Sequence, residues 1–321
     1  YNVYTDGLKI YTSIDSRMQT YAEEAVYGHV AQYLQKEFNK ENAHKPNRPF
    51  SGKLSAQQVQ QIMARSVTQS ERYRTMKEEG ASDEEIKRAF HTPVDMSVFT
   101  YHGEVDTTMT PLDSIRYYKS FLRSAFVSMD PQTGAVKAWV GDIDFKSWKY
   151  DKVTAQRQPG STFKLFVYTE AMNQGLTPCD KRRDEYISME VYDKKKNEMT
   201  TWRPTNANGT FTGDSMPLKT AFARSINSVA VRLGQEMGIK RIIATAEAMG
   251  IKSPLDDAPS LALGSSDVTL LELTNAYCTI ANNGMHHEPV LVTRIVDKDG
   301  NEIYLDRSQA EQVIPYKSAF L

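Results

Sequence analysis

The sequence predicts an α/β domain of the α+β type, in which an antiparallel sheet carries helices on its faces, preceded by a mainly helical region. Two observations lead to this prediction. Residues 123–321 alternate between short apolar strands, a run of helices and strands again. Residues 1–122 are polar, rich in Gln, Glu and Lys, and follow helical periodicity. We therefore expect a helical linker or pedestal at 1–122 and a second domain at 123–321.

The helical region shows ordinary start and stop signals. Apolar residues at helical spacing follow the cap candidates Ser13 and Asp15, and the prolines of 44–53 predict a loop. Ser82 with Glu85 forms a capping box ahead of a further helix. None of these segments carries recognisable chemistry, so a scaffold is the default interpretation of this region.

The second domain begins with strands at 125–130 and 135–140 around a Pro-Gln-Thr-Gly turn. A strand pair is predicted within 185–202, with a polar turn at 193–197, and a last strand pair at 290–296 and 302–305. Further helices are expected at about 218–224, 228–237, 240–249 and 269–282. This order of elements gives the expected sheet with helices on its faces.

Composition excludes several classes of protein. The chain has 39 basic and 40 acidic residues, so it lacks the basic excess of a nucleic-acid-binding protein. No stretch approaches eighteen consecutive apolar residues, so no membrane-spanning helix is expected. Cys179 and Cys278 are far apart in the sequence, and the adjacent His286 and His287 do not form a ligand cluster. We therefore expect neither a metal site nor a cofactor.

Candidate chemistry lies at Ser161 and Lys164. A serine hydroxyl needs a base within hydrogen-bond reach to act as a nucleophile, and position i+3 on a helix places the lysine on the same face. Burial among apolar neighbours such as Phe163 lowers the pKa of a lysine, because it disfavours the charged form. Pro159 and Gly160 supply a sharp entry to the serine. The alternative is an ordinary helix start, with a capping serine and a solvated lysine.

A second element is the Ser-x-Asn sequence at Ser225 and Asn227. By itself it fits a loop between two helices, in which both side chains cap the next helix. In this order the two elements form two-thirds of the serine–lysine acyl-transfer constellation.

Longer stretches make the resemblance specific. RQPGSTFK at 157–164, SMDPQTGAVKAWVG at 128–141, FARSINSVA at 222–230 and PSLALGSSDVTLLELTNAY at 259–277 closely resemble the transpeptidase domain of class A penicillin-binding proteins. GLKIYTSIDSRMQTYAEEAV at 7–26 resembles the linker that leads into such domains. The resemblance implies the penicillin-binding-protein and beta-lactamase-like fold. The resemblance covers nearly all of 123–320. Residues from about 40 to 110 resemble no known segment of this family and are interpreted as a helical insertion in the linker.

The resemblance implies a role for each motif residue. Ser161 would attack the penultimate D-Ala carbonyl of a peptidoglycan stem peptide, and Lys164 would accept its proton. Ser225 would relay a proton to the departing D-Ala nitrogen, and Asn227 would bind the substrate amide. Gly160, Trp202 and Asn206 are further candidates for lining the substrate groove. A surface turn that buries one tryptophan is the alternative for Trp202.

The resemblance also implies ligands and a location. Beta-lactams would acylate Ser161, and no deacylating glutamate is identifiable, so a long-lived acyl-enzyme is expected rather than beta-lactamase turnover. The implied location is the extracytoplasmic, periplasmic side of a bacterial inner membrane, reached through an anchor outside these residues. Cell-wall synthesis accessory proteins are possible partners. The alternative function is a non-catalytic penicillin-sensing or structural module of the same fold.

One departure from the family pattern bears on activity. The family's third motif, Lys-Thr/Ser-Gly, occurs nowhere in the sequence, and Lys219-Thr220 is followed by Ala221. We therefore expect a catalytic domain incomplete at its C-terminus, inactive in turnover by itself, with the third motif and a glycosyltransferase domain in a longer parent protein.

Overall fold

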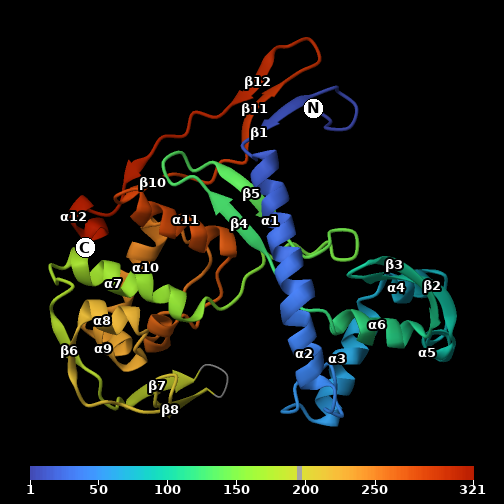
Figure 1. The fold of residues 1–321 in the computed structure, drawn as a ribbon, viewed down its shortest axis with the longest axis horizontal. Coiled ribbons are helices and arrows are strands. Elements are labelled where there is room, and N and C mark those ends of the chain that lie inside the picture. The colour runs from blue at the N-terminus through green and yellow to red at the C-terminus, as the bar shows by residue number, and fades with distance from the viewer. Residues whose placement is uncertain (194–196) are drawn as a thin grey trace. The chain divides into compact units, whose positions relative to one another are not determined.

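The computed structural model describes residues 1–193 and 197–321, which form two compact units (Figure 1). The large unit comprises 1–22, 125–141 and 150–321, and the small unit comprises 23–124 and 142–149. The predicted turn at 193–197 and its Lys194-Lys195-Lys196 tip include three residues outside the described ones. Each unit is described by itself.

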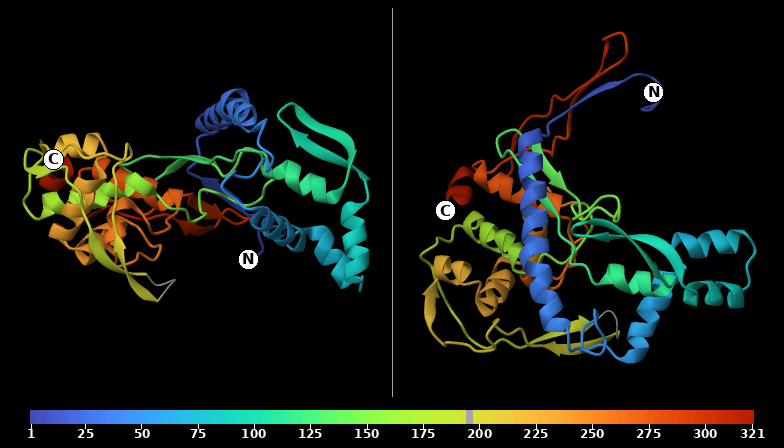
Figure 2. Two further views of the ribbon diagram at one scale, coloured as in Figure 1. Left: turned by 90° about the horizontal axis from the view of Figure 1, so that it is seen from below. Right: turned by 45° about the vertical axis from the view of Figure 1, so that its right-hand side comes forward.

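The strands of the large unit form small antiparallel sheets. β1 pairs with β11 and β11 with β12, while β4 pairs with β5, β6 with β9, β7 with β8 and β10 with β13. Figure 1 and the right view of Figure 2 show β11 and β12 as a hairpin that extends away from α7 to α11. The strands span Lys9–Thr12 (β1), Phe126–Met129 (β4), Val136–Val140 (β5), Lys181–Arg183 (β6), Met189–Asp193 (β7), Glu198–Trp202 (β8), Ser215–Pro217 (β9), Met285–His286 (β10), Val292–Val296 (β11), Glu302–Leu305 (β12) and Glu311–Gln312 (β13). The β4–β5, β7–β8 and β11–β12 hairpins match the sequence prediction, whereas β1 was not predicted.

Helices supply most of the core of the large unit. They span Gly160–Phe163 (η2, a 3₁₀ turn), Lys164–Asn173 (α7), Leu218–Ala223 (α8), Asn227–Met237 (α9), Ile239–Ala248 (α10), Pro259–Leu263 (η3), Leu270–Ala281 (α11) and Tyr316–Phe320 (α12). α7 is buried on nearly every side, including its polar residues Lys164, Thr169 and Glu170. Phe163, Phe166, Leu233 and Ile242 are fully buried in this core. Because each such side chain contributes roughly 1.5–3 kcal/mol on burial, the start of α7 is held firmly.

The small unit is mainly helical, as predicted. Its elements span Val30–Leu34 (η1, a π-helical turn), Gln35–Asn42 (α2), Ala56–Thr68 (α3), Glu71–Glu78 (α4), Asp83–His91 (α5), Val94–Thr100 (β2), Gly103–Met109 (β3) and Pro111–Lys119 (α6). α1 (Ser16–His29) leads into η1 from the large unit. Asp15 caps α1 by accepting from two backbone N–H groups, and Ser82 with Glu85 forms the predicted capping box of α5.

The β2–β3 hairpin was not predicted from the sequence, and its second strand begins at Gly103. Next to it, an aromatic cluster forms the core of the small unit. Phe99 makes edge contacts with Tyr101, Phe121 and Trp148, with ring centroids 5.0–5.5 Å apart. Edge-to-face geometry is the arrangement that aromatic quadrupoles favour. The cluster therefore holds β2 against the end of α6.

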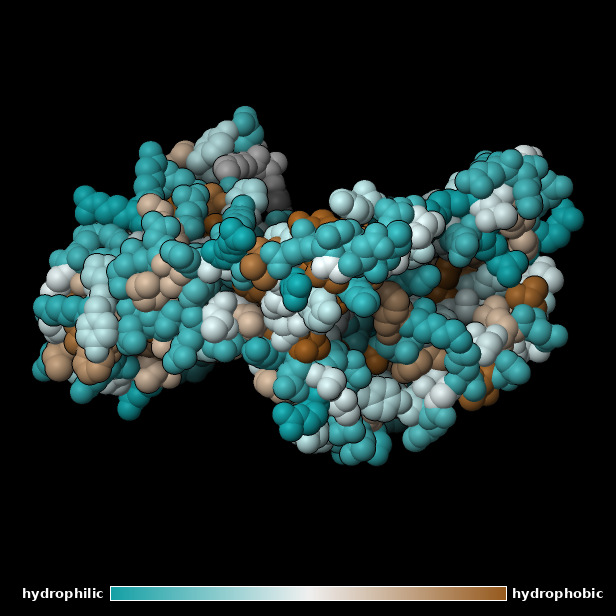
Figure 3. Space-filling view, turned by 90° about the horizontal axis from the view of Figure 1, so that it is seen from above, coloured by the Kyte–Doolittle hydropathy of each residue, from teal (hydrophilic) through white to brown (hydrophobic). Residues whose placement is uncertain are grey.

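Hydrophilic residues dominate the face drawn in Figure 3, and hydrophobic residues appear there in small separate patches. Among the described helices, none is both long and apolar enough to cross a membrane.

Candidate active site

Ser161 lies on the 3₁₀ turn η2, directly before α7. Gly160 has a left-handed φ of +58°, which gives the chain the sharp entry predicted from the sequence. The side chain of Ser161 is exposed, and within the described residues its hydroxyl makes no hydrogen bond. The hydroxyl is therefore open to a ligand.

Lys164 is the first residue of α7 and is only 1% exposed. Its Nζ donates to the backbone oxygen of Ser225 at 2.8 Å, to Ser225 Oγ at 3.0 Å and to Asn227 Oδ1 at 2.6 Å. These acceptors use all three hydrogens of an ammonium group. Burial lowers the pKa of Lys164 to about 8, as the sequence led us to expect.

Ser225 and Asn227 lie where α8 gives way to α9. Ser225 has a left-handed φ of +54°, which is strained for a residue with a side chain and recurs at functional sites. Asn227 Nδ2 donates to Thr205 O at 2.8 Å, so its amide orientation is fixed. The strained turn and this hydrogen bond direct both side chains toward Lys164.

A buried carboxylate supports this turn from behind. Asp184, which is 1% exposed, accepts from Asn206 Nδ2 at 2.7 Å and from Ser228 Oγ at 2.6 Å. Asn206 Oδ1 in turn accepts from the backbone N–H of Asn227 at 2.9 Å. Burial raises the pKa of Asp184, but hydrogen bonds from Ser228, Thr212 and Asn206 outweigh it, so the pKa lies below its usual value. Asp184 therefore remains charged and fixes Asn206.

The segment that carries Ser161 rests on residues 260–268. Arg157 and Val268 exchange two backbone hydrogen bonds of 2.9 and 3.0 Å, and the N–H of Gly160 donates to Gly264 O at 3.3 Å. Tyr277 donates its hydroxyl to Thr162 O at 3.0 Å. The segment that carries Ser161 is thus held by residues 260–268 as well as by α7.

The structure unites part of the predicted site. Lys164, Ser225, Asn227 and Asn206 belong to one hydrogen-bond network, but within the described residues no hydrogen bond joins Ser161 to Lys164. The polar atoms of Asn206 bond to protein groups. Trp202 ends β8 opposite Met189 and is partly buried. Among the described residues, no hydrogen bond joins Trp202 to this network.

Sequence reasoning missed Asp184, Ser228 and Gly264. Asp184 has no motif around it, and its partners lie 22 and 44 residues away in the sequence. Gly264 follows an apolar run and precedes Ser265 and Ser266, which signals a turn but not a contact with Gly160.

Two family models match the chain, and together they cover most of it. The penicillin binding protein transpeptidase domain matches residues 124–319, and the penicillin-binding protein middle domain matches 45–122. The chain therefore belongs to the penicillin-binding protein transpeptidase family. The segment interpreted from sequence as an insertion at about 40–110 falls largely within the match to the middle domain.

Individual relatives agree with this assignment. Penicillin-binding protein 1A of Rickettsia bellii is 30% identical over 315 residues, which are 94% of this chain and 39% of that protein. Penicillin-binding protein 1A from Haemophilus influenzae has a similar fold, with a TM-score of 0.62, 21% identity, and coverage of 95% of this chain and 47% of that one. PonA1 from Mycobacterium tuberculosis, solved in complex with penicillin V, aligns with a TM-score of 0.53 and 20% identity over 80% of this chain and 68% of that one. The chain spans less than half the length of the curated relatives it matches.

Proposed function

We propose that this chain supplies the serine acyl-transfer site of a D-Ala-D-Ala transpeptidase that cross-links peptidoglycan stem peptides. Family membership supports transpeptidase chemistry, and the environment of Lys164 supports the residue assignment. A buried lysine with a pKa of about 8, three residues after an exposed serine, is the observation that carries the proposal.

In this mechanism Ser161 Oγ attacks the carbonyl carbon of the penultimate D-Ala and its proton passes to Lys164. Lys164 must first be neutral, because the ammonium form has no lone pair to accept a proton. Loss of one proton leaves two hydrogens for three acceptors, so one of the contacts with Ser225 or Asn227 is released. The ammonium re-formed on Lys164 returns a proton to Ser225 Oγ as the Ser225 hydroxyl gives its own proton to the departing D-Ala nitrogen. The amine of a second stem peptide then attacks the acyl carbonyl, its proton passes through Lys164 to Ser161 Oγ, and the cross-linked product leaves Ser161 free.

The same site accounts for the proposed ligands. A beta-lactam presents a strained acyl group that Ser161 would open, and PonA1 from Mycobacterium tuberculosis binds penicillin V. We propose Asn227 as the group that holds the ligand amide and Asn206 as the residue that positions Asn227. Gly160 and Trp202 remain proposed groove residues. Peptidoglycan as substrate places the site outside the bacterial cytoplasmic membrane, where accessory proteins of cell-wall synthesis would meet it.

The test is covalent labelling with a fluorescent penicillin, followed by peptide mapping. We expect label on Ser161, complete loss of label in Ser161→Ala, and retention in Thr162→Ala, which removes the neighbouring hydroxyl that bonds Pro159 O. A protein that is folded but never labelled would support the non-catalytic module instead. Rapid release of the opened drug would indicate beta-lactamase turnover.

The absence of a Lys-Thr/Ser-Gly sequence bears on the scale of the expected activity. We propose that these residues by themselves turn over peptide substrates poorly. Labelling by fluorescent penicillin is therefore to be compared with cross-linking of a stem-peptide substrate, both measured on the 321-residue chain. Cross-linking as fast as acylation would contradict this part of the proposal.

A further inference from the structure

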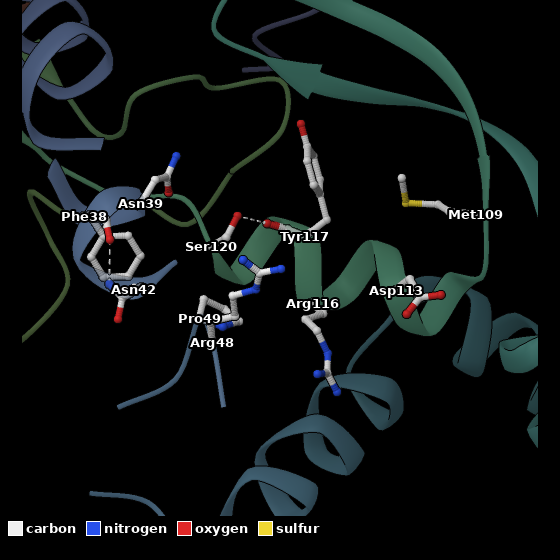
Figure 4. Close-up of a pocket in the computed structure, with 10 residues that line it drawn as sticks. All are labelled: Phe38, Asn39, Asn42, Arg48, Pro49, Met109, Asp113, Arg116, Tyr117 and Ser120. Carbon is white, nitrogen blue, oxygen red and sulfur yellow. Dashed lines mark hydrogen bonds between the residues drawn. The ribbon is translucent and has the colours of Figure 1, made fainter. Parts of the chain in front are cut away.

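The small unit contains a cavity of about 430 Å³ between α2 and α6, separate in the sequence from every active-site residue (Figure 4). Its lining combines apolar and polar side chains from four segments of the unit. They are Phe38, Asn39, Asn42, Arg48, Pro49, Met109, Asp113, Arg116, Tyr117 and Ser120. A concave, largely apolar pocket with a few polar groups is the usual form of a binding site.

The walls of this cavity are fixed by hydrogen bonds behind it. Gln35, a buried residue at the start of α2, donates to Ser120 O at 2.9 Å and accepts from the backbone N–H of Leu122 at 2.8 Å. Tyr117 donates its hydroxyl to Phe99 O at 2.7 Å, which ties α6 to β2. These contacts hold α2 and α6 at a set separation, so the cavity is preformed and a ligand does not have to open it.

Charge at the cavity is positive. Arg48 and Arg116 are exposed, and within the described part of the chain neither forms an ion pair. The Arg48 guanidinium donates to the backbone oxygen of Ala43 at 3.2 Å, and Figure 4 shows its side chain reaching from the loop toward α6. The one carboxylate in the lining, Asp113, accepts from the Thr110 hydroxyl at the start of α6. Two guanidinium groups therefore have free donors for an anion.

Asn42 adds an accessible acceptor. Its Nδ2 donates to Phe38 O at 2.7 Å, and no described residue donates to its Oδ1. The Oδ1 atom is not among the buried side-chain atoms that lack a partner, so it reaches solvent and is open to an N–H donor of a ligand. A ligand with an anionic group, an N–H donor and an apolar part would therefore match the site.

We propose that this cavity binds a short acidic peptide segment. Its carboxylate would meet Arg48 and Arg116, its backbone N–H would donate to Asn42 Oδ1, and its apolar side chain would lie against Phe38, Pro49 and Met109. A fatty acid lacks the N–H donor, and a neutral peptide leaves both guanidinium groups unpaired. The small unit is in this respect a recognition module for an acidic partner, a role independent of acyl transfer at Ser161.

The experiment uses isothermal titration of the 321-residue chain with the acetylated tetrapeptide amide Leu-Glu-Leu-Glu. The matched control probe is Leu-Gln-Leu-Gln, which has the same shape without charge. We expect the charged probe to bind at least tenfold more tightly, with an affinity that falls as salt is raised. Equal binding of both probes would overturn the proposal.

Variants locate the binding. The double variant Arg48→Gln/Arg116→Gln is expected to lower the affinity for the charged probe at least tenfold. Phe38→Ala is expected to lower it several-fold, whereas Arg241→Gln on α10 should leave it unchanged. Thermal unfolding checks that each variant is folded. If Phe38→Ala fails to fold, the arginine pair, which lies at the exposed rim, still decides the outcome. An unchanged affinity in the folded double variant overturns the proposal. So would arginine-dependent binding to phosphatidylglycerol vesicles without peptide binding, because it would identify a membrane as the partner.

Discussion

Gly264 lies so close to Gly160 that a β-carbon on Gly264 would stand 2.1 Å from the Gly160 carbonyl oxygen. Gly264 also has a left-handed φ of +73°. Gly160, the residue before Ser161, is thus placed by a backbone-to-backbone contact that only glycine permits. The contact couples the turn at Ser161 to the end of η3.

Gly264→Ala is therefore expected to destabilise the protein by about 3 kcal/mol or more. The left-handed backbone accounts for roughly 1–2 kcal/mol and displacement of the Gly160 carbonyl for the rest. Gly209→Ala is the matched control, because Gly209 has a φ of +74° but nothing within 4 Å of its β-carbon position. Urea unfolding measures the loss of stability in each variant. Equal losses in Gly264→Ala and Gly209→Ala would show that the contact with Gly160 is unimportant.

Lys164 is expected to titrate with a midpoint of about 8, because its burial disfavours the ammonium form. The side-chain carbon resonance of Lys164, assigned from its disappearance in Lys164→Arg, reports this titration directly. A folded-state pKa below the ordinary 10.5 means that the folded protein binds fewer protons than the unfolded chain between these pH values. This group's contribution to stability therefore rises as pH increases from about 8 to 10.5. Acylation of Ser161 should accelerate through the same midpoint.

Asn227→Ala gives an internal check on that titration. It removes the 2.6 Å hydrogen bond from Lys164 to Asn227 Oδ1, which stabilises the charged form, so the midpoint should fall further. A midpoint that rises, or stays where it was, would mean that Asn227 does not contact the ammonium.

Asp184→Asn is expected to cost about 2–3 kcal/mol, since an amide cannot accept from Ser228, Asn206 and Thr212 at once. The exposed Asp214→Asn should stay within about 0.5 kcal/mol of the wild type. Asp184 has a lowered pKa, so its stabilisation is complete above its ordinary value of 3.8 and is lost as pH falls through the folded-state pKa. The free energy of unfolding, measured from pH 7 down to pH 2, should therefore fall less steeply in Asp184→Asn than in the wild type.

Arg123→Ala should destabilise the small unit by about 3–5 kcal/mol. Arg123 pairs with Asp142, whose side chain is 2% exposed, and stacks 4.3 Å from the ring centre of Trp148. Truncation leaves a buried carboxylate without its cation and removes the stacking contact. Arg123→Lys keeps the charge but not the planar guanidinium, so its free energy of unfolding should lie between those of the wild type and Arg123→Ala.

A double-mutant cycle with Asp142→Ala isolates the pair. If the ion pair matters, the double variant loses less than the sum of the two single losses. Additive losses in urea unfolding would assign the effect to packing instead.

Local signals predicted the parts of this protein that depend on neighbours in the sequence. A capping box predicted the start of α5, and the spacing of Ser161 and Lys164 predicted the segment of the candidate site. Contacts between distant residues left no such signal. Asp184 reaches Ser228 across 44 residues, and the burial that sets the pKa of Lys164 depends on several helices packed around α7. The hairpin at β2–β3 was missed because its polar alternation resembles loop sequence.

The pairing of β1 with β11 has a consequence for how the protein is made. Lys9 lies opposite Val296, so β1 finds its partner only after residue 296 has been synthesised. Closing so long a loop is entropically costly and slow compared with forming the local hairpins. Until then β1 is an unpaired edge, and the small unit, whose contacts are mostly nearer in sequence, is able to form earlier. The β1–β11 pairing is therefore expected to form after the local hairpins and the small unit have folded.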